Sequence, residues 1–199
     1  MKTKICIVRH GETDWNAVGR LQGSMDIALN ETGLNQAREC AHALQDQHFD
    51  VIITSPLKRA KQTASVIHEQ LGVPMVVADE FIEMHFGKGE GLTLEERQSA
   101  FPNQLIYPGQ ESLESLTKRI VSGLHRIVEE YDGQSICLVA HGRVINDLLN
   151  IVSNGDLSGG KLGLVNGCIS RIEWDSGIWT VCDFNNIDHL SHFSDIGRI

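Results

Sequence analysis

The sequence predicts an α/β fold with a mainly parallel central sheet that helices cover on both faces. Short apolar runs alternate along the chain with helical segments that carry an apolar stripe, and turn residues separate them. Alternation of this kind is typical of parallel sheets. The chain has 199 residues and shows neither an internal repeat nor a linker. We therefore expect a single domain over residues 1–199.

The first half of the chain is expected to hold three strands and two helices. The strands are short apolar runs at residues 4–8, 50–54 and 75–78. Asn30 is expected to cap a helix over 31–47. The second helix is expected to begin at Ser55-Pro56, with Ser55 as N-cap and Pro56 at the first helical position, and to end at Gly72.

The second half begins with a Gly-rich, irregular stretch over 79–93. The elements expected after it are a short helix at 94–100, a long amphipathic helix at 112–131, a strand at 135–140, a helix after His141-Gly142, and an antiparallel strand pair at 168–174 and 179–184. The strand pair should turn at Asp175-Ser176-Gly177.

Composition and charge exclude several classes of function. The formal net charge is −9, which argues against general nucleic-acid binding. No apolar stretch is long enough to cross a membrane, and the first residues lack the features of a signal peptide, so a cytoplasmic protein is expected. The five cysteines form no C-x-x-C pair. Cys6, Cys137 and Cys182 lie in strand-like runs, where small buried side chains are expected.

The segment Arg9-His10-Gly11-Glu12 follows the first strand and carries a candidate nucleophile. A neutral imidazole attacks well near neutral pH and can form a covalent intermediate. An adjacent arginine can neutralise a phosphate with its planar set of donors. Gly11 would let the backbone approach a ligand closely. By itself this short motif is compatible equally with a structural turn.

Two later segments strengthen the functional interpretation. Arg59 lies in the first turn of a predicted helix, where free N–H groups and the helix dipole favour an anion. His141 follows the strand 135–140, and by itself it could equally be a buried structural histidine. In parallel sheets ligands bind beyond the carboxyl ends of the strands, so His10 and His141 can meet there. Clustered Arg and His would make the site positive in a protein whose net charge is −9.

These motifs, in this order, resemble the histidine phosphatase superfamily, also called the phosphoglycerate mutase-like family. The resemblance covers residues 4–189 and rests on R-H-G-E-T-x-W-N, Q-G, S-P-L-x-R-A-x-Q-T-A and A-H-G. It implies a three-layer α/β/α sandwich and a metal-independent phosphohistidine mechanism that needs no cofactor. By position, His10 would be the nucleophile, and the phosphate pocket would be completed by Arg9, Arg59 and His141. The substrate side would be lined by Asn16, Gln22 and Gly23, and the Gly142 backbone would close the pocket.

The resemblance also implies a general acid in a loop of the form E-x-x-x-G-x-W-E-G. Glu83 matches the acid, while Glu80 and Glu90 are competing carboxylates. Gly89 stands where the family usually has Trp, so we expect a more mobile or more open loop. His189, in the tail, could approach the pocket, although a surface or core position is favoured.

The function expected is hydrolysis of small phosphomonoesters with broad specificity, because the tail resembles that of short broad-specificity family members. No metal, nucleic-acid or membrane partner is expected, and the oligomeric state cannot be derived from the sequence. A phosphoglycerate mutase remains the first alternative, although the stretch from Gly91 to Tyr131 leaves little material for a lid. A non-catalytic phospho-ligand binding module is the second. A metal site is a weaker idea, since the nine histidines show no ligand pattern.

Overall fold

A six-stranded sheet forms the centre of the molecule in the computed structural model, which describes residues 2–157 and 162–194. The strand order is β3-β2-β4-β1-β5-β6. The strands are β1 (Thr3–Arg9), β2 (Val51–Thr54), β3 (Met75–Val77), β4 (Ser135–Ala140), β5 (Ile169–Asp175) and β6 (Ile178–Asn186). The strands β3, β2, β4 and β1 are parallel, and β5 pairs antiparallel with both β1 and β6.

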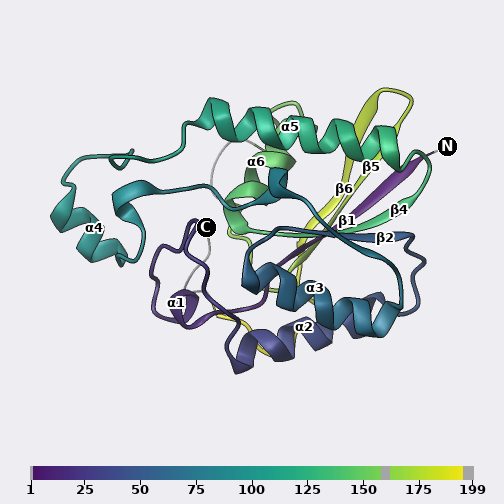
Figure 1. Cartoon of the computed structure of the whole chain (residues 1–199), viewed down its shortest axis with the longest axis horizontal. Helices are drawn as coiled ribbons and strands as arrows, with labels where there is room; N and C mark the ends of the chain where they lie inside the picture. The colour runs from purple at the N-terminus through teal and green to yellow at the C-terminus, as the bar shows by residue number, and fades with distance from the viewer. Residues whose placement is uncertain (1, 158–161, 195–199) are drawn as a thin grey trace.

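Helices cover the two faces of this sheet (Figure 1). One face packs against α2 (Glu31–Leu44) and α3 (Lys58–Leu71), and the other against α5 (Leu113–Glu130) and α6 (Gly142–Val152). Short helical segments fill the loops: α1 (Asp14–Ala17), η1 (Asp79–Phe81), η2 (Gly87–Gly89) and α4 (Leu94–Ala100). The structure thus confirms the three-layer α/β/α sandwich with a mainly parallel sheet.

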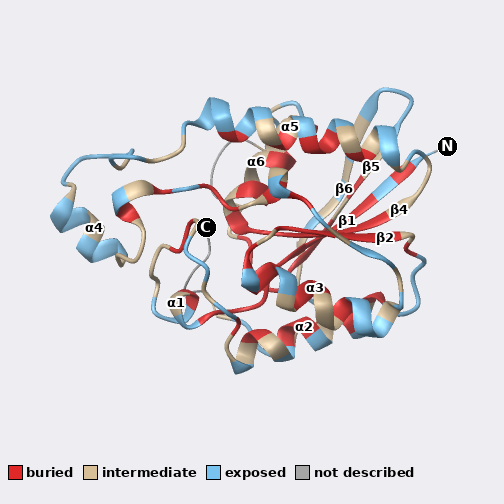
Figure 2. Cartoon of the chain, viewed as in Figure 1, coloured by how far each residue is buried: buried red, intermediate tan, exposed pale blue. Residues whose placement is uncertain are grey.

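Two apolar clusters, one on each face, form the core. The cluster under α5 and α6 is the larger and includes Ile7, Leu138 and Leu148, while that under α2 and α3 includes Val8, Cys137 and Ala64. Figure 2 shows the central strands as almost continuously buried, whereas α4 has no buried residue. Since β1, β2 and β4 are buried on both sides, the backbone at their carboxyl ends is held in fixed register.

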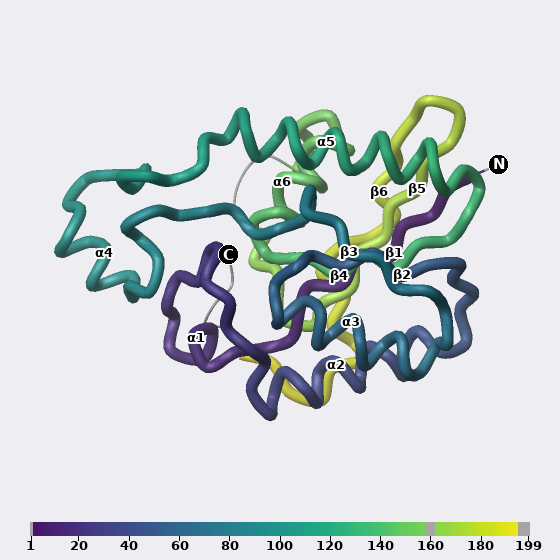
Figure 3. Tube along the Cα trace, in the orientation of Figure 1, coloured from purple at the N-terminus to yellow at the C-terminus, as the bar shows by residue number. Residues whose placement is uncertain are grey.

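Two segments lie outside this sandwich and matter for the site. The segment with α4 extends away from the body as an arm between Gly91 and Gly109, and the C-terminal residues, yellow in Figure 3, lie beside α2. The side chain of Gln36 on α2 donates to the carbonyl of His192 at 3.3 Å. Among the described residues, no helix combines the length and the apolar character that a membrane span requires.

The structure corrects two details of the sequence-based expectation. Ser55 and Pro56 are not the first residues of α3, because that helix begins at Lys58 with Leu57 as N-cap. Cys182 is exposed, since β6 is an edge strand whose alternate residues face solvent, whereas Cys6 and Cys137 are buried as expected. Asn30 does cap α2, where its side chain accepts a hydrogen bond from the Gly33 amide at 2.8 Å.

Candidate active site

Three neighbouring strands end at the same edge of the sheet and bring the candidate residues together. Strands β2, β4 and β1 are adjacent, and their ends lie in register, with Arg9 opposite Ala140 and Thr54 opposite Val139. Each strand is followed directly by a polar residue: His10, Ser55 and His141. The rings of His10 and His141 lie 5.1 Å apart between centroids.

The His10 ring is oriented by its own loop. Its Nδ1 lies 2.7 Å from the Gly11 carbonyl oxygen, an acceptor, so Nδ1 carries the proton in the neutral ring and Nε2 keeps a free lone pair. The main chain of His10 is held as well: its amide donates to Ala140, and its carbonyl accepts from the Asn166 side chain at 3.0 Å. The ring that could attack phosphorus is therefore fixed both at the backbone and at Nδ1.

Position 11 requires glycine for packing against α2, a constraint that the sequence did not indicate. A Cβ at this position would lie 2.3 Å from the Gly33 carbonyl oxygen, so the close approach is to the start of α2 and not only to a ligand. The Gly11 amide also donates to the hydroxyl of Thr63 on α3 at 3.1 Å. Both helices of one face thus hold the loop that carries His10.

Arg59 and His141 form a directly bonded pair. The Nε–H of Arg59 donates to Nδ1 of His141 at 3.2 Å, which leaves the proton of the neutral ring on Nε2, where it lies 2.6 Å from the Ser55 hydroxyl. The two terminal nitrogens of Arg59 donate to the carbonyls of Met25 and Gly23, at 2.7 and 2.8 Å. Ser55, expected only as a helix cap, is thus a partner of His141.

Burial and positive charge keep both histidines neutral. Burial lowers the pKa of His10 well below its usual value, and the charges of Arg59 and Arg9 add to this. The same causes lower the pKa of His141. Burial also lowers the pKa of Arg59, to about 10, which is still well above neutral pH, and it lowers the pKa of Arg9. Because guanidinium is too basic to lose its proton in proteins, both groups are cations. Arg9 donates to the Leu164 carbonyl. Two buried cations beside two neutral imidazoles form a local site for an anion.

Of the three competing carboxylates, only Glu83 is buried at this site. Its Oε1 accepts from the amides of Met84 at 2.9 Å and Val144 at 3.3 Å, and its Oε2 from the Arg143 amide at 3.3 Å, so it lies at the N-terminus of α6. Burial raises its pKa, while Arg59 and the backbone donors oppose the shift. Glu80 pairs instead with Arg126, and Glu90 binds the Ser24 amide and hydroxyl.

The residues expected on the substrate side, Asn16, Gln22, Gly23 and Gly142, are all buried. The Asn16 side chain closes a capping box with Thr13 and accepts from Asn166 at 3.3 Å. The Gln22 Oε1 is buried, and the described part of the chain offers it no hydrogen-bond partner. Gly142 begins α6 directly after His141. Hydrogen bonds connect Asn16 through Asn166 to His10, and Gly23 to Arg59, while Gln22 is placed only by its burial next to Gly23 in the chain.

The loop around Gly89 differs from the expectation of a more open wall. Gly89 is buried, and a Cβ there would lie 2.4 Å from Cδ2 of Tyr107. The Tyr107 ring, which packs against Phe101 in a tilted arrangement with centroids 5.5 Å apart, therefore occupies the space that a side chain at position 89 would need. The space beside Gly89 is thus filled by an aromatic ring from a different segment.

Sequence reasoning missed Asn166, although Asn-Gly before a strand is a turn signal. The tail supports the same turn: His189, partly buried, donates from Nε2 to the Gly167 carbonyl at 3.0 Å. The favoured position of His189 outside the pocket agrees with this contact.

Comparison with known proteins agrees with the geometry. The profile of the histidine phosphatase superfamily (branch 1) matches residues 5–187. A Bacillus subtilis (strain 168) protein named "Uncharacterized phosphatase PhoE" is 46% identical over 191 residues, which cover 96% of this chain and 98% of the relative. The "Metal-independent phosphoserine phosphatase" of Arabidopsis thaliana is 33% identical, covering 98% of this chain and 87% of the relative.

Among solved structures, Bacillus stearothermophilus YhfR superposes with a TM-score of 0.87 at 25% identity, covering 95% of this chain and all of that one. The chain therefore belongs to the histidine phosphatase superfamily. The resemblance, the fold class and the assignment to the phosphatases that the sequence predicted are confirmed.

Proposed function

We propose that this phosphatase hydrolyses small organic phosphomonoesters without a metal ion and carries the phosphoryl group on His10. The observation that carries the proposal is the pairing of a neutral, oriented His10 with two buried guanidinium groups. The imidazole supplies an uncharged nucleophile, and Arg9 and Arg59 supply the positive charge that stabilises the non-bridging oxygens.

In the first step Nε2 of His10 attacks phosphorus while the bond to the ester oxygen breaks. Charge moves onto the leaving oxygen, and a protonated Glu83 donates its proton there. The raised pKa of Glu83 supports this role, because a buried carboxyl keeps its proton at a higher pH than an exposed one. In the second step water attacks the phosphorus of phospho-His10 and gives a proton to Glu83, while the P–N bond breaks and inorganic phosphate leaves. His141, whose Nδ1 accepts from Arg59, would turn its Nε2–H from the Ser55 hydroxyl to a phosphate oxygen.

The substrate is proposed to be a small-molecule phosphomonoester, with broad specificity. Support for broad specificity comes from exposed hydrophobic side chains on the arm that carries α4, namely Leu94, Leu105 and Ile106, because apolar contacts select weakly among organic groups. The named activities of relatives differ, from phosphoserine phosphatase to "Phosphoglycerate mutase-like protein 4" of Arabidopsis thaliana. Interconversion of 2- and 3-phosphoglycerate without release of phosphate would favour the mutase alternative.

The test compares His10→Ala with His48→Gln, a control histidine that is exposed on the surface beside Asp50. We expect His10→Ala to lose p-nitrophenyl phosphate hydrolysis by at least about a thousandfold, and His48→Gln to retain it. Labelled phosphate from substrate should be trapped on His10 after a denaturing quench at alkaline pH, and the label should be stable in base and lost in acid, as expected for a P–N bond. Hydrolysis by His10→Ala near the wild-type rate, or loss of wild-type activity in EDTA, would refute the proposal.

A further inference from the structure

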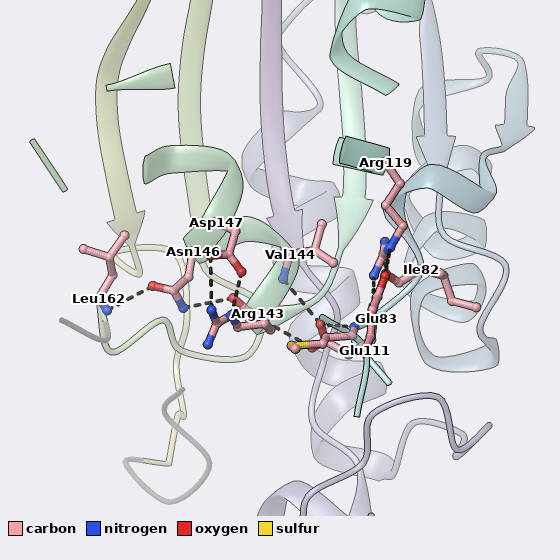
Figure 4. A network of polar contacts seen from close by, with 11 residues as sticks. Ile82, Glu83, Glu111, Arg119, Arg143, Val144, Asn146, Asp147 and Leu162 are labelled. Atoms are coloured by element: carbon pink, nitrogen blue, oxygen red, sulfur yellow. Dashed lines mark hydrogen bonds and ion pairs between the residues drawn. The ribbon is translucent and has the colours of Figure 1, made fainter. Parts of the chain in front are cut away.

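Arg119, on α5, contacts the main chain of the loop that carries the proposed acid Glu83. Its NH1 donates to two carbonyls of that loop, Glu80 at 2.8 Å and Ile82 at 2.6 Å. The Ile82 carbonyl belongs to the peptide bond that leads into Glu83. One guanidinium therefore fixes the main chain immediately before the carboxyl group (Figure 4).

The carboxylate of Glu111 pairs with Arg119, and its residue also contacts the loop after Glu83. Glu111 binds Arg119 in a bidentate manner, with oxygens 2.8 Å from Nε and 3.0 Å from NH2. The Glu111 amide also donates to the His85 carbonyl at 2.8 Å. The Arg119–Glu111 pair thus holds the loop at Ile82 and at His85, on both sides of Glu83.

Among the described residues, the carboxyl group itself receives hydrogen bonds from backbone amides alone, those of Met84 in its own loop and of Arg143 and Val144 at the start of α6. The Arg143 side chain, which could have neutralised it, is turned away to Asp147, with Nε 2.5 Å from Oδ2 (Figure 4). No side chain in the described part of the chain donates a hydrogen bond to Glu83, so the position of its carboxyl group depends on how its loop is anchored. Both residues of the anchoring pair are mostly buried, with side chains 19% and 16% exposed.

We propose that Arg119, held by Glu111, is a positioning residue that sets Glu83 for proton donation to the leaving oxygen. This inference rests on the proposed function. A general acid must lie within hydrogen-bond reach of the atom it protonates, and small displacements are costly. Leaving groups that are strong bases, such as the alkoxide of phosphoserine, depend on that proton, while p-nitrophenolate depends on it little.

The experiment measures kcat/KM of Arg119→Met with phosphoserine and with p-nitrophenyl phosphate. We expect at least about a tenfold greater loss with phosphoserine, since general acid catalysis contributes factors of about 10²–10⁴. Glu111→Gln should show the same selectivity to a smaller extent. It removes the ionic partner but keeps the amide contact, so it is the milder variant if Arg119→Met folds poorly.

Arg126→Met is the matched control. Arg126 lies two turns further along α5 and also forms a bidentate pair, with the Glu80 carboxylate at 2.8 and 3.0 Å, but it contacts no carbonyl next to Glu83. We expect it to change kcat/KM less than about twofold, and equally for both substrates. Equal losses with the two substrates in Arg119→Met and Glu111→Gln, or the same selectivity in Arg126→Met, would overturn the inference.

A second comparison separates the inference from the proposed function. Glu83→Gln should itself show the leaving-group selectivity, and adding Arg119→Met to it should cause little further selective loss, because Arg119 acts through Glu83. If Glu83→Gln loses more kcat/KM with phosphoserine than with p-nitrophenyl phosphate and Arg119→Met does not, only the positioning role of Arg119 is wrong. If Glu83→Gln is not selective either, the acid role and the inference both fail, while the His10 chemistry stands.

Discussion

The contact between Gly89 and Tyr107 gives a prediction that can be worked from the structure. In Gly89→Ala the new methyl carbon would lie 2.4 Å from Cδ2 and 2.8 Å from Cε2 of the Tyr107 ring, far inside van der Waals contact. The ring cannot move freely, because it packs in a tilted arrangement against Phe101 and the backbone amide of Tyr107 donates to the Gln110 side chain at 3.2 Å. The substitution therefore overpacks the contact between Gly89 and Tyr107 and should cost about 1–3 kcal/mol in the free energy of unfolding.

The assay is urea unfolding and thermal unfolding of the wild type, Gly89→Ala, Tyr107→Ala and the double variant. A cost of about 2 kcal/mol corresponds to a fall in Tm of roughly 4–8 °C for a chain of this size. In the Tyr107→Ala background, where the ring is gone, the cost of Gly89→Ala should fall to near zero, giving a coupling energy of about 1–3 kcal/mol. An equal cost in the two backgrounds would show that the ring is not what position 89 accommodates.

Two further predictions concern the His10 loop. Asn166→Ala removes the donor to the buried His10 carbonyl and to Asn16, so we expect a loss of about 1–3 kcal/mol in unfolding free energy together with slower phosphoryl transfer; full wild-type kcat/KM would contradict this. His10 is neutral when folded, so as the pH falls through its unfolded pKa the unfolded chain gains a proton that the folded chain does not, and stability is lost. Glu83, whose pKa is raised, acts in the opposite sense, being stabilising at low pH and losing that contribution as the pH rises. The difference in unfolding free energy between the wild type and His10→Asn should therefore shrink by about 1.4 kcal/mol from pH 7.5 to 5.5; a difference independent of pH would argue against a neutral, buried His10.

Much of the fold followed from local patterns. Strand β4 has the bounds that its apolar run predicted, and α2 begins at the expected cap. The hairpin turns where Ser176 and Gly177 adopt positive φ, as a two-residue turn requires. Each of these depends on neighbours along the chain. The start of α3 was misplaced because Ser55 has the chemistry of a helix cap, but its hydroxyl lies against His141.

For the candidate site too, some features could be predicted from the sequence and others depend on the tertiary structure. The nine expected residues could be named from the sequence, because each follows a strand or lies in a short motif, and parallel strands deliver such residues to one edge. Which ring nitrogen is free, however, depends on contacts between residues far apart in the chain, such as Arg59 with His141. So does the neutral state of both rings, which results from burial beside Arg9 and Arg59.

The sequence by itself determined the class of fold and the family, and it named the residues that we propose to surround the phosphate. Only the tertiary structure decided what holds those residues: Asn166 behind His10, Arg119 and Glu111 behind Glu83, and Tyr107 in the space beside Gly89. The physical reason is that side-chain hydrogen bonds and close packing join segments that no local pattern relates. Periodicity and turn residues report on neighbouring positions along the chain, while the shape and charge of a pocket depend on positions brought together by the sheet.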